Sequence, residues 1–313
     1  MGGVVDLLTR AYRIPLVDPF RGLRAREGLL LQGPAGWGEF SPFVEYGPAL
    51  ARWWAAAARE GAEGVWPEPR RSVIPVNVTV PAVTPERAHK IVTSSRCSTA
   101  KVKVAEGDDG ARVEAVRDAL GPAGKLRVDA NGAWQVDEAE KAIRELDAYD
   151  LEYVEQPVAS LEEMAALRKK VDVPLAADES VRRAEDPMRV ARLEAADIVV
   201  LKVQPLGGVR RALDIAERAG LPAVVSSALE TSVGISAGLA LAAALEDLPY
   251  ACGLATVSLL EGDVTGDPLV AEDGFIQARR PAVDEEALAP YVLEGRPAEA
   301  WDRRLAAALG PGA

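Results

Sequence analysis

The chain has 313 residues, of which 49% are hydrophobic, and its formal net charge is −12. That is enough apolar material for one large barrel with an appended domain. The acidic charge argues against a nucleic-acid partner, which needs a basic face. The two cysteines, Cys97 and Cys252, match neither a zinc pattern nor a secreted disulfide scaffold. Neither a signal peptide nor a membrane-spanning run is found, so the sequence predicts a cytoplasmic protein without a membrane partner.

Residues 1–72 differ in pattern from the rest of the chain. In residues 4–16 and 27–33, apolar residues alternate with polar ones or form continuous runs, a pattern typical of strands. Residues 46–59 place apolar side chains at steps of three and four, in the manner of a helix. The sequence therefore predicts an N-terminal α+β capping domain, and the stretch PEPRR that follows reads as its linker.

From residue 73 to residue 262, short apolar runs alternate with helical patterns. The runs lie at 73–80, 99–105, 126–131, 153–157, 174–179, 197–203, 222–228 and 250–256. The helix after the first run has Thr84 as its expected N-cap and Pro85 at its first position. Eight such runs with intervening helices predict an α/β fold, a modified TIM (β/α) barrel. The proline-rich tail, residues 263–313, lacks such a unit, and we expect it to pack back on the capping domain.

Five charged residues recur at intervals of 23 to 26 positions, each in or just after one of these runs. They are Lys103, Asp129, Glu155, Asp178 and Lys202. In a barrel the carboxyl ends of successive strands meet at one mouth, so these side chains are expected to converge there. A single Asp after a strand is usually a helix cap or a loop residue, and a lysine on a strand is usually exposed. The inference therefore depends on the register of all five.

Carboxylates on neighbouring strand ends are hard oxygen ligands. Asp129, Glu155 and Asp178 can approach one divalent cation, with Mg²⁺ as the default and Mn²⁺ as a substitute. Lys103 and Lys202 come from the second and sixth strands and would stand on opposite sides of the metal. A lysine beside a dication and a second lysine has a lowered pKa and can act as a base. The matching task is proton removal next to the carboxylate of a small-molecule substrate, with the metal stabilising the enediolate.

The strand-end motifs K-x-K, D-A-N, V-E-Q-P, D-E-S and L-K resemble those of the enolase superfamily. The resemblance covers most of the chain, and the two opposed lysines are similar to the muconate lactonising subgroup. The combination of VEQP, ADES, LKVQPLGG and SSALETSVG is most similar to the o-succinylbenzoate synthase family. This resemblance implies a Mg²⁺-dependent lyase of menaquinone biosynthesis. Its reaction would be the syn-dehydration of 2-succinyl-6-hydroxy-2,4-cyclohexadiene-1-carboxylate to 2-succinylbenzoate.

The resemblance also implies roles for single residues. Lys103 would abstract the α-proton and then protonate the departing hydroxyl, while Lys202 would stabilise the enediolate from the other face of the ring. Lys101 would lie beside the base and lower its pKa or touch the substrate carboxylate. Asn131 and Glu179 would orient the metal ligands and Lys202. The metal ligands themselves would be Asp129, Glu155 and Asp178.

The same resemblance places four residues on the substrate side. Ser226 and Ser227 end the seventh run, Gly253 lies in the eighth, and Arg21 belongs to DPFRGLR, which resembles a mobile loop that closes over the site. For the serines a plain strand–helix turn is an equal reading, and an arginine in a loop is more often solvated. The helix that begins near Thr231 could direct its N-terminus at a succinyl carboxylate.

Two other functions stay open. His89, the only histidine, is expected on the surface, which removes a His–Asp base, and the eighth run lacks the D-x-D that dipeptide epimerases use for a substrate ammonium. Racemisation of N-succinyl amino acids uses the same two lysines and is an alternative. A non-catalytic barrel that only binds a dicarboxylate is an alternative of another class. The sequence is compatible with a monomer or a small homo-oligomer.

Overall fold

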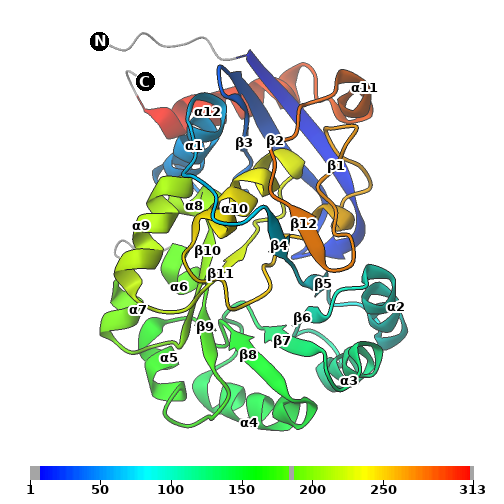
Figure 1. Cartoon of the computed structure of the whole chain (residues 1–313), viewed down its shortest axis with the longest axis vertical. Helices are drawn as coiled ribbons and strands as arrows, with labels where there is room; N and C mark the ends of the chain where they lie inside the picture. Colours follow the sequence, from blue (N-terminus) through cyan, green and yellow to red (C-terminus); the bar gives the residue numbers. More distant parts are fainter. Residues whose placement is uncertain (1–7, 183–186, 311–313) are drawn as a thin grey trace.

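The computed structural model describes residues 8–182 and 187–310. Parallel strands and surrounding helices form the lower part of the molecule, and a small antiparallel sheet with helices lies above them (Figure 1). This confirms the predicted combination of a (β/α) barrel with an α+β cap. Of the first predicted strand, residues 4–7 lie outside the described residues.

The capping sheet is antiparallel, and helix α1 follows it along the chain. Its elements are β1 (Leu8–Phe20), β2 (Leu23–Gly33), β3 (Gly36–Phe40) and α1 (Pro48–Glu63). A two-residue turn joins β1 to β2, with φ of 51° at Arg21 and 74° at Gly22. Two successive positive φ values give a tight turn that matches the twist of the paired strands. The segment DPFRGLR is therefore the tip of a hairpin rather than an irregular loop.

Seven parallel strands form the barrel sheet, in the order β11-β10-β9-β8-β7-β6-β5. They are β5 (Val78–Val80), β6 (Thr99–Lys103), β7 (Lys125–Asp129), β8 (Leu151–Glu155), β9 (Leu175–Ala177), β10 (Ile198–Lys202) and β11 (Ala223–Ser226). Single bridges, Val76 with Cys252 and Ser226 with Gly253, connect the two ends of this sheet. The predicted eighth strand is thus reduced to isolated pairings.

The first predicted strand, 73–80, is broken in two. Its first piece, β4 (Val73–Pro75), pairs antiparallel with β12 (Phe275–Gln277) of the C-terminal tail, and only β5 joins the barrel. Pro75, which has no N–H to donate to a ladder, is the last residue of β4, and after it the chain changes partner from β12 to Cys252. The Pro75 carbonyl instead accepts a hydrogen bond from Cys252 N at 2.7 Å. The expectation of one continuous strand is wrong for this physical reason.

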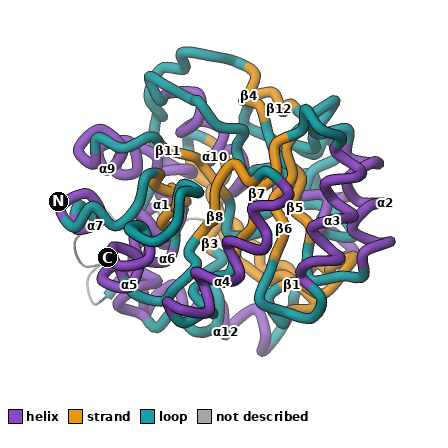
Figure 2. The backbone as a smooth tube through the Cα atoms, turned by 90° about the horizontal axis from the view of Figure 1, so that it is seen from below, coloured by secondary structure: helices purple, strands orange, loops and turns teal. Residues whose placement is uncertain are grey.

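The barrel helices lie outside the strands, as the view from below shows for α2, α3 and α4 (Figure 2). They are α2 (Pro85–Ser95), α3 (Asp109–Leu120), α4 (Val136–Leu146), α5 (Leu161–Leu167), α6 (Glu179–Arg182), α7 (Arg189–Arg192), α8 (Val203–Leu206), α9 (Val209–Ala219) and α10 (Ser232–Ala244). As predicted, Thr84 caps α2 and accepts a hydrogen bond from Arg87 N at 3.3 Å. Within the described ranges, no helix combines the length and apolar character needed to cross a membrane.

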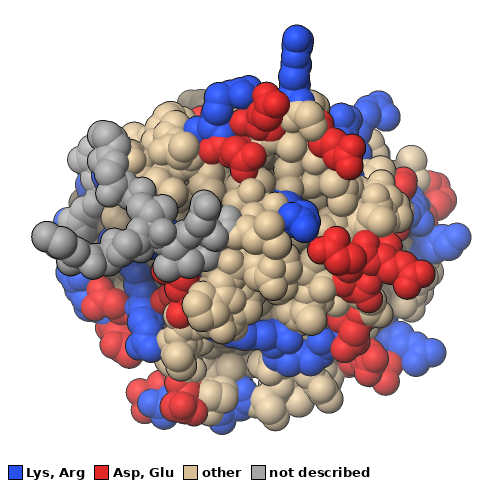
Figure 3. Space-filling model, turned by 90° about the horizontal axis from the view of Figure 1, so that it is seen from above, with Lys and Arg blue, Asp and Glu red and all other residues tan. Residues whose placement is uncertain are grey.

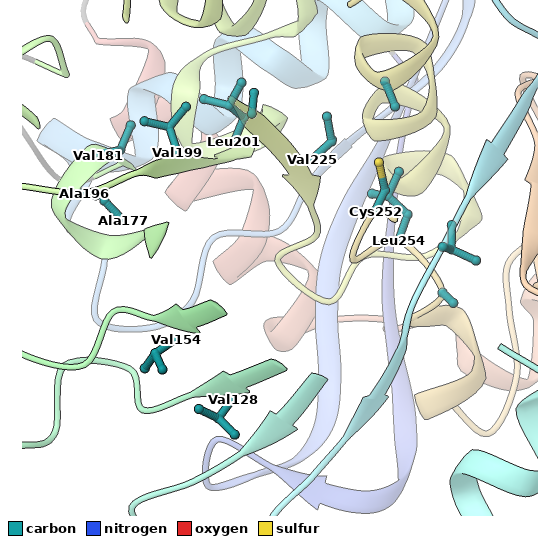
Figure 4. Packing of buried hydrophobic residues seen from close by; sticks show 14 of the residues in the cluster. Val128, Val154, Ala177, Val181, Ala196, Val199, Leu201, Val225, Cys252 and Leu254 are labelled. Carbon is teal, nitrogen blue, oxygen red and sulfur yellow. The ribbon is translucent and has the colours of Figure 1, made fainter. Parts of the chain in front are cut away.

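Side chains of the barrel strands alternate between the helices and the barrel interior. The close view in Figure 4 shows Val128, Val154, Leu201 and Val225, which come from β7, β8, β10 and β11. These side chains are buried in the main hydrophobic cluster. Since successive residues of a strand point to opposite faces, the next residues, the charged strand ends, point into the barrel. The packing of the valines therefore fixes the direction of the charges.

Helix α1 docks on the barrel through one carboxylate. Glu60 accepts backbone hydrogen bonds from Val209 and Arg210, the first residues of α9. The preceding pair, Gly207 and Gly208, has φ of 94° and 123°, and a Cβ on Gly208 would lie 2.6 Å from Glu60 Oε2. The two glycines therefore allow helix α1 to approach the start of α9, and this close contact explains the glycines of the motif PLGG.

The C-terminal tail contacts both parts of the molecule. After β12 come α11 (Glu285–Leu288) and α12 (Arg296–Leu309), and α12 lies against α1. Trp301 of α12 meets Phe40 of the capping sheet edge to face, with 6.1 Å between ring centroids. The end of the tail therefore packs on the cap, while β12 extends the first barrel segment through its pairing with β4. The domain boundaries at residues 72 and 262 stay a prediction.

We predict that Glu60→Ala lowers the free energy of unfolding by about 1–2 kcal/mol, because it leaves the first amides of α9 without their acceptor. Urea denaturation followed by circular dichroism measures this change. Glu63→Ala is the matched control, since Glu63 is exposed on the same helix and forms an ion pair with Arg59 one turn away. Equal effects of the two substitutions would contradict the docking role of Glu60.

Candidate active site

The barrel brings the predicted charged residues together at the carboxyl ends of its strands. Lys103, Asp129 and Glu155 are successive register partners on β6, β7 and β8. Asp178 follows β9 directly, and Lys202 is the last residue of β10. All three carboxylates are fully buried. The convergence that the spacing predicted is therefore present.

Each carboxylate is paired with a lysine. Lys103 Nζ lies 2.5 Å from Asp129 Oδ2, and Lys202 Nζ lies 2.6 Å from Asp178 Oδ2. Lys101 Nζ lies 2.6 Å from Glu155 Oε2 and 3.4 Å from Asp129 Oδ2. The site thus holds three ammonium groups against three carboxylates, which is the pairing that buried charges need.

The three carboxylates are oxygen ligands of the kind that a hard divalent cation prefers, although each also contacts a lysine. Among the described residues, no three carboxylate, histidine or cysteine side chains form a ready-made metal cluster. Glu155 Oε1, however, is buried and has no hydrogen-bond partner. A buried oxygen of this kind is costly unless something binds it. Three buried carboxylates on adjacent strand ends, one with a vacant lone pair, therefore fit a cation such as Mg²⁺.

The lysines differ in their electrostatic environment. Burial lowers the pKa of Lys103, and the attraction of Asp129 only partly offsets this because Lys101 and Lys202 repel its charge. For Lys101, burial also acts to lower the pKa, but the carboxylates of Glu155 and Asp129 outweigh it and raise the pKa. Lys103 is therefore the lysine that gives up its proton more readily, which is the direction expected for a base.

The pKa values of Asp129 and Glu155 are shifted in opposite directions. Burial opposes ionisation of Asp129, but the adjacent Lys103 and Lys101 overcome it and hold the pKa of this carboxyl well below its usual range. Burial raises the pKa of Glu155 to about 7, with a further contribution from the charge of Asp129. Asp129 is therefore the carboxyl that the lysines hold most firmly in its ionised form.

Asn131 connects the base to the residues behind it. Its Oδ1 accepts from Lys103 Nζ at 2.7 Å, its backbone N donates to Asp129 Oδ1 at 3.0 Å, and its Nδ2 donates to Glu179 Oε1 at 3.2 Å. The sequence predicted that Asn131 and Glu179 together orient the metal ligands and Lys202. Asn131 contacts the proposed ligand Asp129, and it also contacts Lys103, because it follows β7, the strand beside β6.

A small cavity lies between the two catalytic candidates. It is lined by the predicted residues Lys101, Lys103, Lys202, Ser226, Ser227, Gly253 and Arg21, and also by Phe20, Phe43, Thr79, Ala228, Leu229 and Thr256. Its volume is about 30 Å³, room for little more than a water, whereas ligand pockets usually measure about 300–1,000 Å³. A second cavity of about 310 Å³ adjoins it and shares Phe20, Arg21 and Lys103. The hairpin tip, with Phe20 and Arg21, therefore covers the site.

Sequence reasoning missed the aromatic part of this lining. Phe20 lies in the segment already singled out, and its ring centroid is 5.4 Å from Lys103 Nζ. Phe43 lies after β3 in a turn-rich stretch that carries no periodic pattern, so no sequence signal marks it. The predicted surface position of His89 is correct, since its side chain is partly exposed and lies 3.2 Å from Asp118.

The N-terminus of α10 is occupied by two carboxylates of the protein. Glu39 Oε2 accepts hydrogen bonds from Thr231 N at 3.1 Å and from Gly234 N at 3.0 Å. Asp263 Oδ1 accepts from Ser232 N at 3.1 Å. The expectation that this helix start faces a substrate carboxylate is therefore wrong, because its amides already have anionic partners.

Next to this helix start lies Glu230, a buried carboxyl that faces the cavity-lining segment. Its Oε2 accepts a hydrogen bond from Ala228 N at 2.7 Å. Burial, together with the charge of Glu39, raises the pKa of Glu230 to about 7. The folded protein therefore prefers the protonated form of Glu230.

Comparison with known proteins identifies the family. Residues 84–282 match the family described as "Enolase C-terminal domain-like", and residues 11–62 match "Enolase N-terminal domain-like". The chain belongs to the enolase superfamily. The sequence-based assignment to this superfamily is thereby confirmed.

Two curated relatives within the superfamily are similar over nearly the whole chain. An o-succinylbenzoate synthase of Thermobifida fusca is 62% identical over 305 residues, which is 96% of this chain and 95% of the relative. An o-succinylbenzoate synthase of Mycolicibacterium smegmatis is 50% identical, covering 95% of this chain and 94% of the relative.

Solved structures share the fold at lower identity. A muconate lactonizing enzyme from Pseudomonas fluorescens, complexed with muconolactone, has a TM-score of 0.79 at 23% identity and covers 92% of this chain and 98% of its own. A dipeptide epimerase from Enterococcus faecalis, complexed with Mg and a dipeptide, has a TM-score of 0.74 at 24% identity and covers 88% of this chain and 97% of its own. At such identity these structures establish the fold alone.

The raised pKa of Glu230 predicts a pH-dependent stability difference for Glu230→Gln. Below the unfolded value of 4.5, both states hold the proton and Glu230 has no effect. As the pH rises toward 7, the unfolded state ionises first, so the wild type loses stability that the variant keeps. The gain of the variant is expected to grow to roughly 3–4 kcal/mol and to level off above neutral pH, since a tenfold change in ionisation equals about 1.4 kcal/mol.

Urea denaturation at several pH values between 4.5 and 8 measures this difference. Glu246→Gln, in an exposed position just beyond the other end of α10, is the control and is expected to show a constant difference. A pH-independent difference for Glu230→Gln would contradict the buried, protonated state.

Proposed function

We propose that this protein is an o-succinylbenzoate synthase that dehydrates 2-succinyl-6-hydroxy-2,4-cyclohexadiene-1-carboxylate to 2-succinylbenzoate. The observation that carries this proposal is the 62% identity with the Thermobifida fusca enzyme over 96% of the chain. The arrangement of Lys103 and Lys202 around buried carboxylates supports the chemistry. A cytoplasmic location and a role in menaquinone biosynthesis belong to the same proposal.

In the proposed site, Asp129, Glu155 and Asp178 hold Mg²⁺, and Mn²⁺ is an acceptable substitute. When bound, the cation supplies Lewis-acid stabilisation of the negative charge that develops on the substrate carboxylate. The ion pairs with Lys101, Lys103 and Lys202 would hold these three carboxylates in position for the cation.

Lys103 is the proposed base. Its neutral form, favoured by burial, takes the proton from the carbon next to the ring carboxylate, and the resulting ammonium returns a proton to the hydroxyl that leaves on the same face. One C–H bond and one C–O bond break, a C=C bond forms, and water departs. Asn131 holds Lys103 Nζ through its side-chain oxygen, which orients the base through both steps.

Lys202 is the proposed electrostatic stabiliser. It stands on β10, on the far side of the barrel sheet from β6, and Asp178 holds its ammonium group. Its positive charge faces the ring as negative charge develops there. Lys101 remains paired with Glu155, which keeps this buried ligand in place. Ser226, Ser227, Gly253 and Arg21 are the proposed substrate contacts, since they line the cavity between the two lysines.

The partner in this proposal is a small carboxylate. On the described part of the face seen from above, acidic and basic side chains are interspersed among neutral ones (Figure 3). Such a mixed surface differs from the broad basic patch that nucleic acid requires. Selection of the substrate is therefore assigned to the cavity under the cap.

The first test is turnover. We expect loss of the diene absorbance of the substrate when Mg²⁺ is present, no turnover after chelation with EDTA, and full recovery when Mg²⁺ is added back. Because N-succinyl amino acid racemisation uses the same two lysines, racemisation of N-succinyl amino acids is assayed in parallel. Racemisation without dehydration would replace the proposal by the racemase alternative, and binding without either reaction would favour a dicarboxylate-binding barrel.

The second test separates the two lysines from the scaffold. Lys103→Ala and Lys202→Ala are each expected to reduce kcat by about 10²–10⁴-fold, the usual contribution of a positioned proton-transfer group. Lys125→Ala is the control, because Lys125 is exposed at the opposite end of β7. Circular dichroism verifies that all three variants are folded. Substantial remaining activity in either cavity variant would refute the two-lysine mechanism.

A further inference from the structure

Arg26 is a buried arginine whose hydrogen bonds, within the described part of the chain, all go to backbone oxygens. It lies on β2 of the cap and is 3% exposed. Its Nε donates to the Leu229 carbonyl at 2.8 Å, and its Nη2 donates to the carbonyls of Ser41 and Ala228. Within the described residues, no carboxylate lies at ion-pair distance from it. A capping residue thus holds two carbonyls of the barrel, more than 200 positions away along the chain.

The two carbonyls belong to the segment Ser226–Leu229, which forms one wall of the cavity. Leu229 has φ of 63°, a left-handed conformation that costs a non-glycine residue about 1–2 kcal/mol. Such a conformation persists only where neighbouring groups impose it. Here the carbonyls of Ala228 and Leu229 are held by Arg26, and the Ala228 amide is held by Glu230.

Arg26 also contacts the opposite side of the cavity through Phe43. Its guanidinium carbon lies 4.4 Å from the centroid of the Phe43 ring, and that of Arg21 lies 5.0 Å from the same ring. Cations over an aromatic face are attracted to it. Phe43 and Arg21 both line the cavity, whereas Arg26 does not. Arg26 therefore connects the wall of the barrel with the tip of the hairpin that covers it.

We infer that Arg26 is a positioning residue for substrate binding, which acts by fixing the backbone of Ser226–Leu229 from the cap. This inference rests on the proposed function, since it concerns the same cavity. Without the guanidinium, Leu229 is free to leave its left-handed conformation, and the wall then shifts relative to Lys103 and Lys202. A shift of about 1 Å in a positioning element can reduce a rate by 10²-fold, while the lysines and carboxylates themselves are untouched.

The test compares Arg26→Met and Arg26→Lys with Arg13→Met. Arg13 lies on β1 of the same sheet, is exposed and does not line the cavity, so its variant is the matched control. We expect Arg26→Met to raise KM at least 10-fold with a smaller change in kcat. Arg26→Lys keeps the charge and can reach one carbonyl, so an intermediate KM is expected. The control is expected to resemble the wild type.

A second readout does not depend on activity. Amide hydrogen exchange of the peptide that spans residues 226–231 is expected to be faster in both Arg26 variants than in Arg13→Met. If the wild type fails to convert the diene acid, the proposed function is wrong, and the exchange measurement still tests the role of Arg26. The inference is overturned if exchange in this peptide is unchanged, or if activity falls only in proportion to the folded fraction while KM stays constant.

Discussion

Three lysine side chains and three carboxylates lie together in the interior of this barrel, where they are almost completely buried. Removing one charge from water costs several kcal/mol unless a partner of opposite sign is supplied. The strands must therefore place positive and negative side chains at the same level of the barrel. The register of Lys103 with Asp129 and Glu155 does so. This balance is a condition for folding as well as for chemistry, because an error in register would leave several buried charges unpaired.

The same balance constrains what the site binds. A dication adds two positive charges to a group of side chains that is neutral as a whole, and the proposed substrate brings two carboxylates. Bound together, cation and substrate preserve neutrality, whereas either one alone disturbs it. The proposed ligands are thus matched to the protein in total charge as well as in shape.

The cap is joined to the barrel by carboxylates and an arginine that reach across the interface. Glu60 and Glu39 bind the first amides of α9 and α10, and Arg26 binds the carbonyls before α10. Helix starts carry partial positive charge, so these carboxylates are favourably placed. The interface therefore depends on a few directional contacts in addition to apolar packing.

Much of the site could be predicted because it follows from a repeat. Strand alternation and a nearly constant unit length place Lys103, Asp129 and Lys202 in one mouth without knowledge of any distant contact. Arg26 and Phe43 carry no such signal, since their roles depend on segments far apart in the chain. The eighth strand was overestimated because its residues match a strand pattern but meet a proline-interrupted neighbour at Pro75. The short-range pattern thus predicted the charged residues of the site. The residues that surround them depend on contacts between distant segments, which the pattern does not show.

The tight turn at Arg21 and Gly22 has a consequence for the dynamics of the site. A flexible lid must be ordered each time it closes, at a cost of about 1–2 kcal/mol for every residue that becomes fixed. Here the covering element is already hydrogen-bonded to itself as a hairpin. Because this turn is already formed, its ordering cost is met once, during folding, and does not recur with every catalytic cycle.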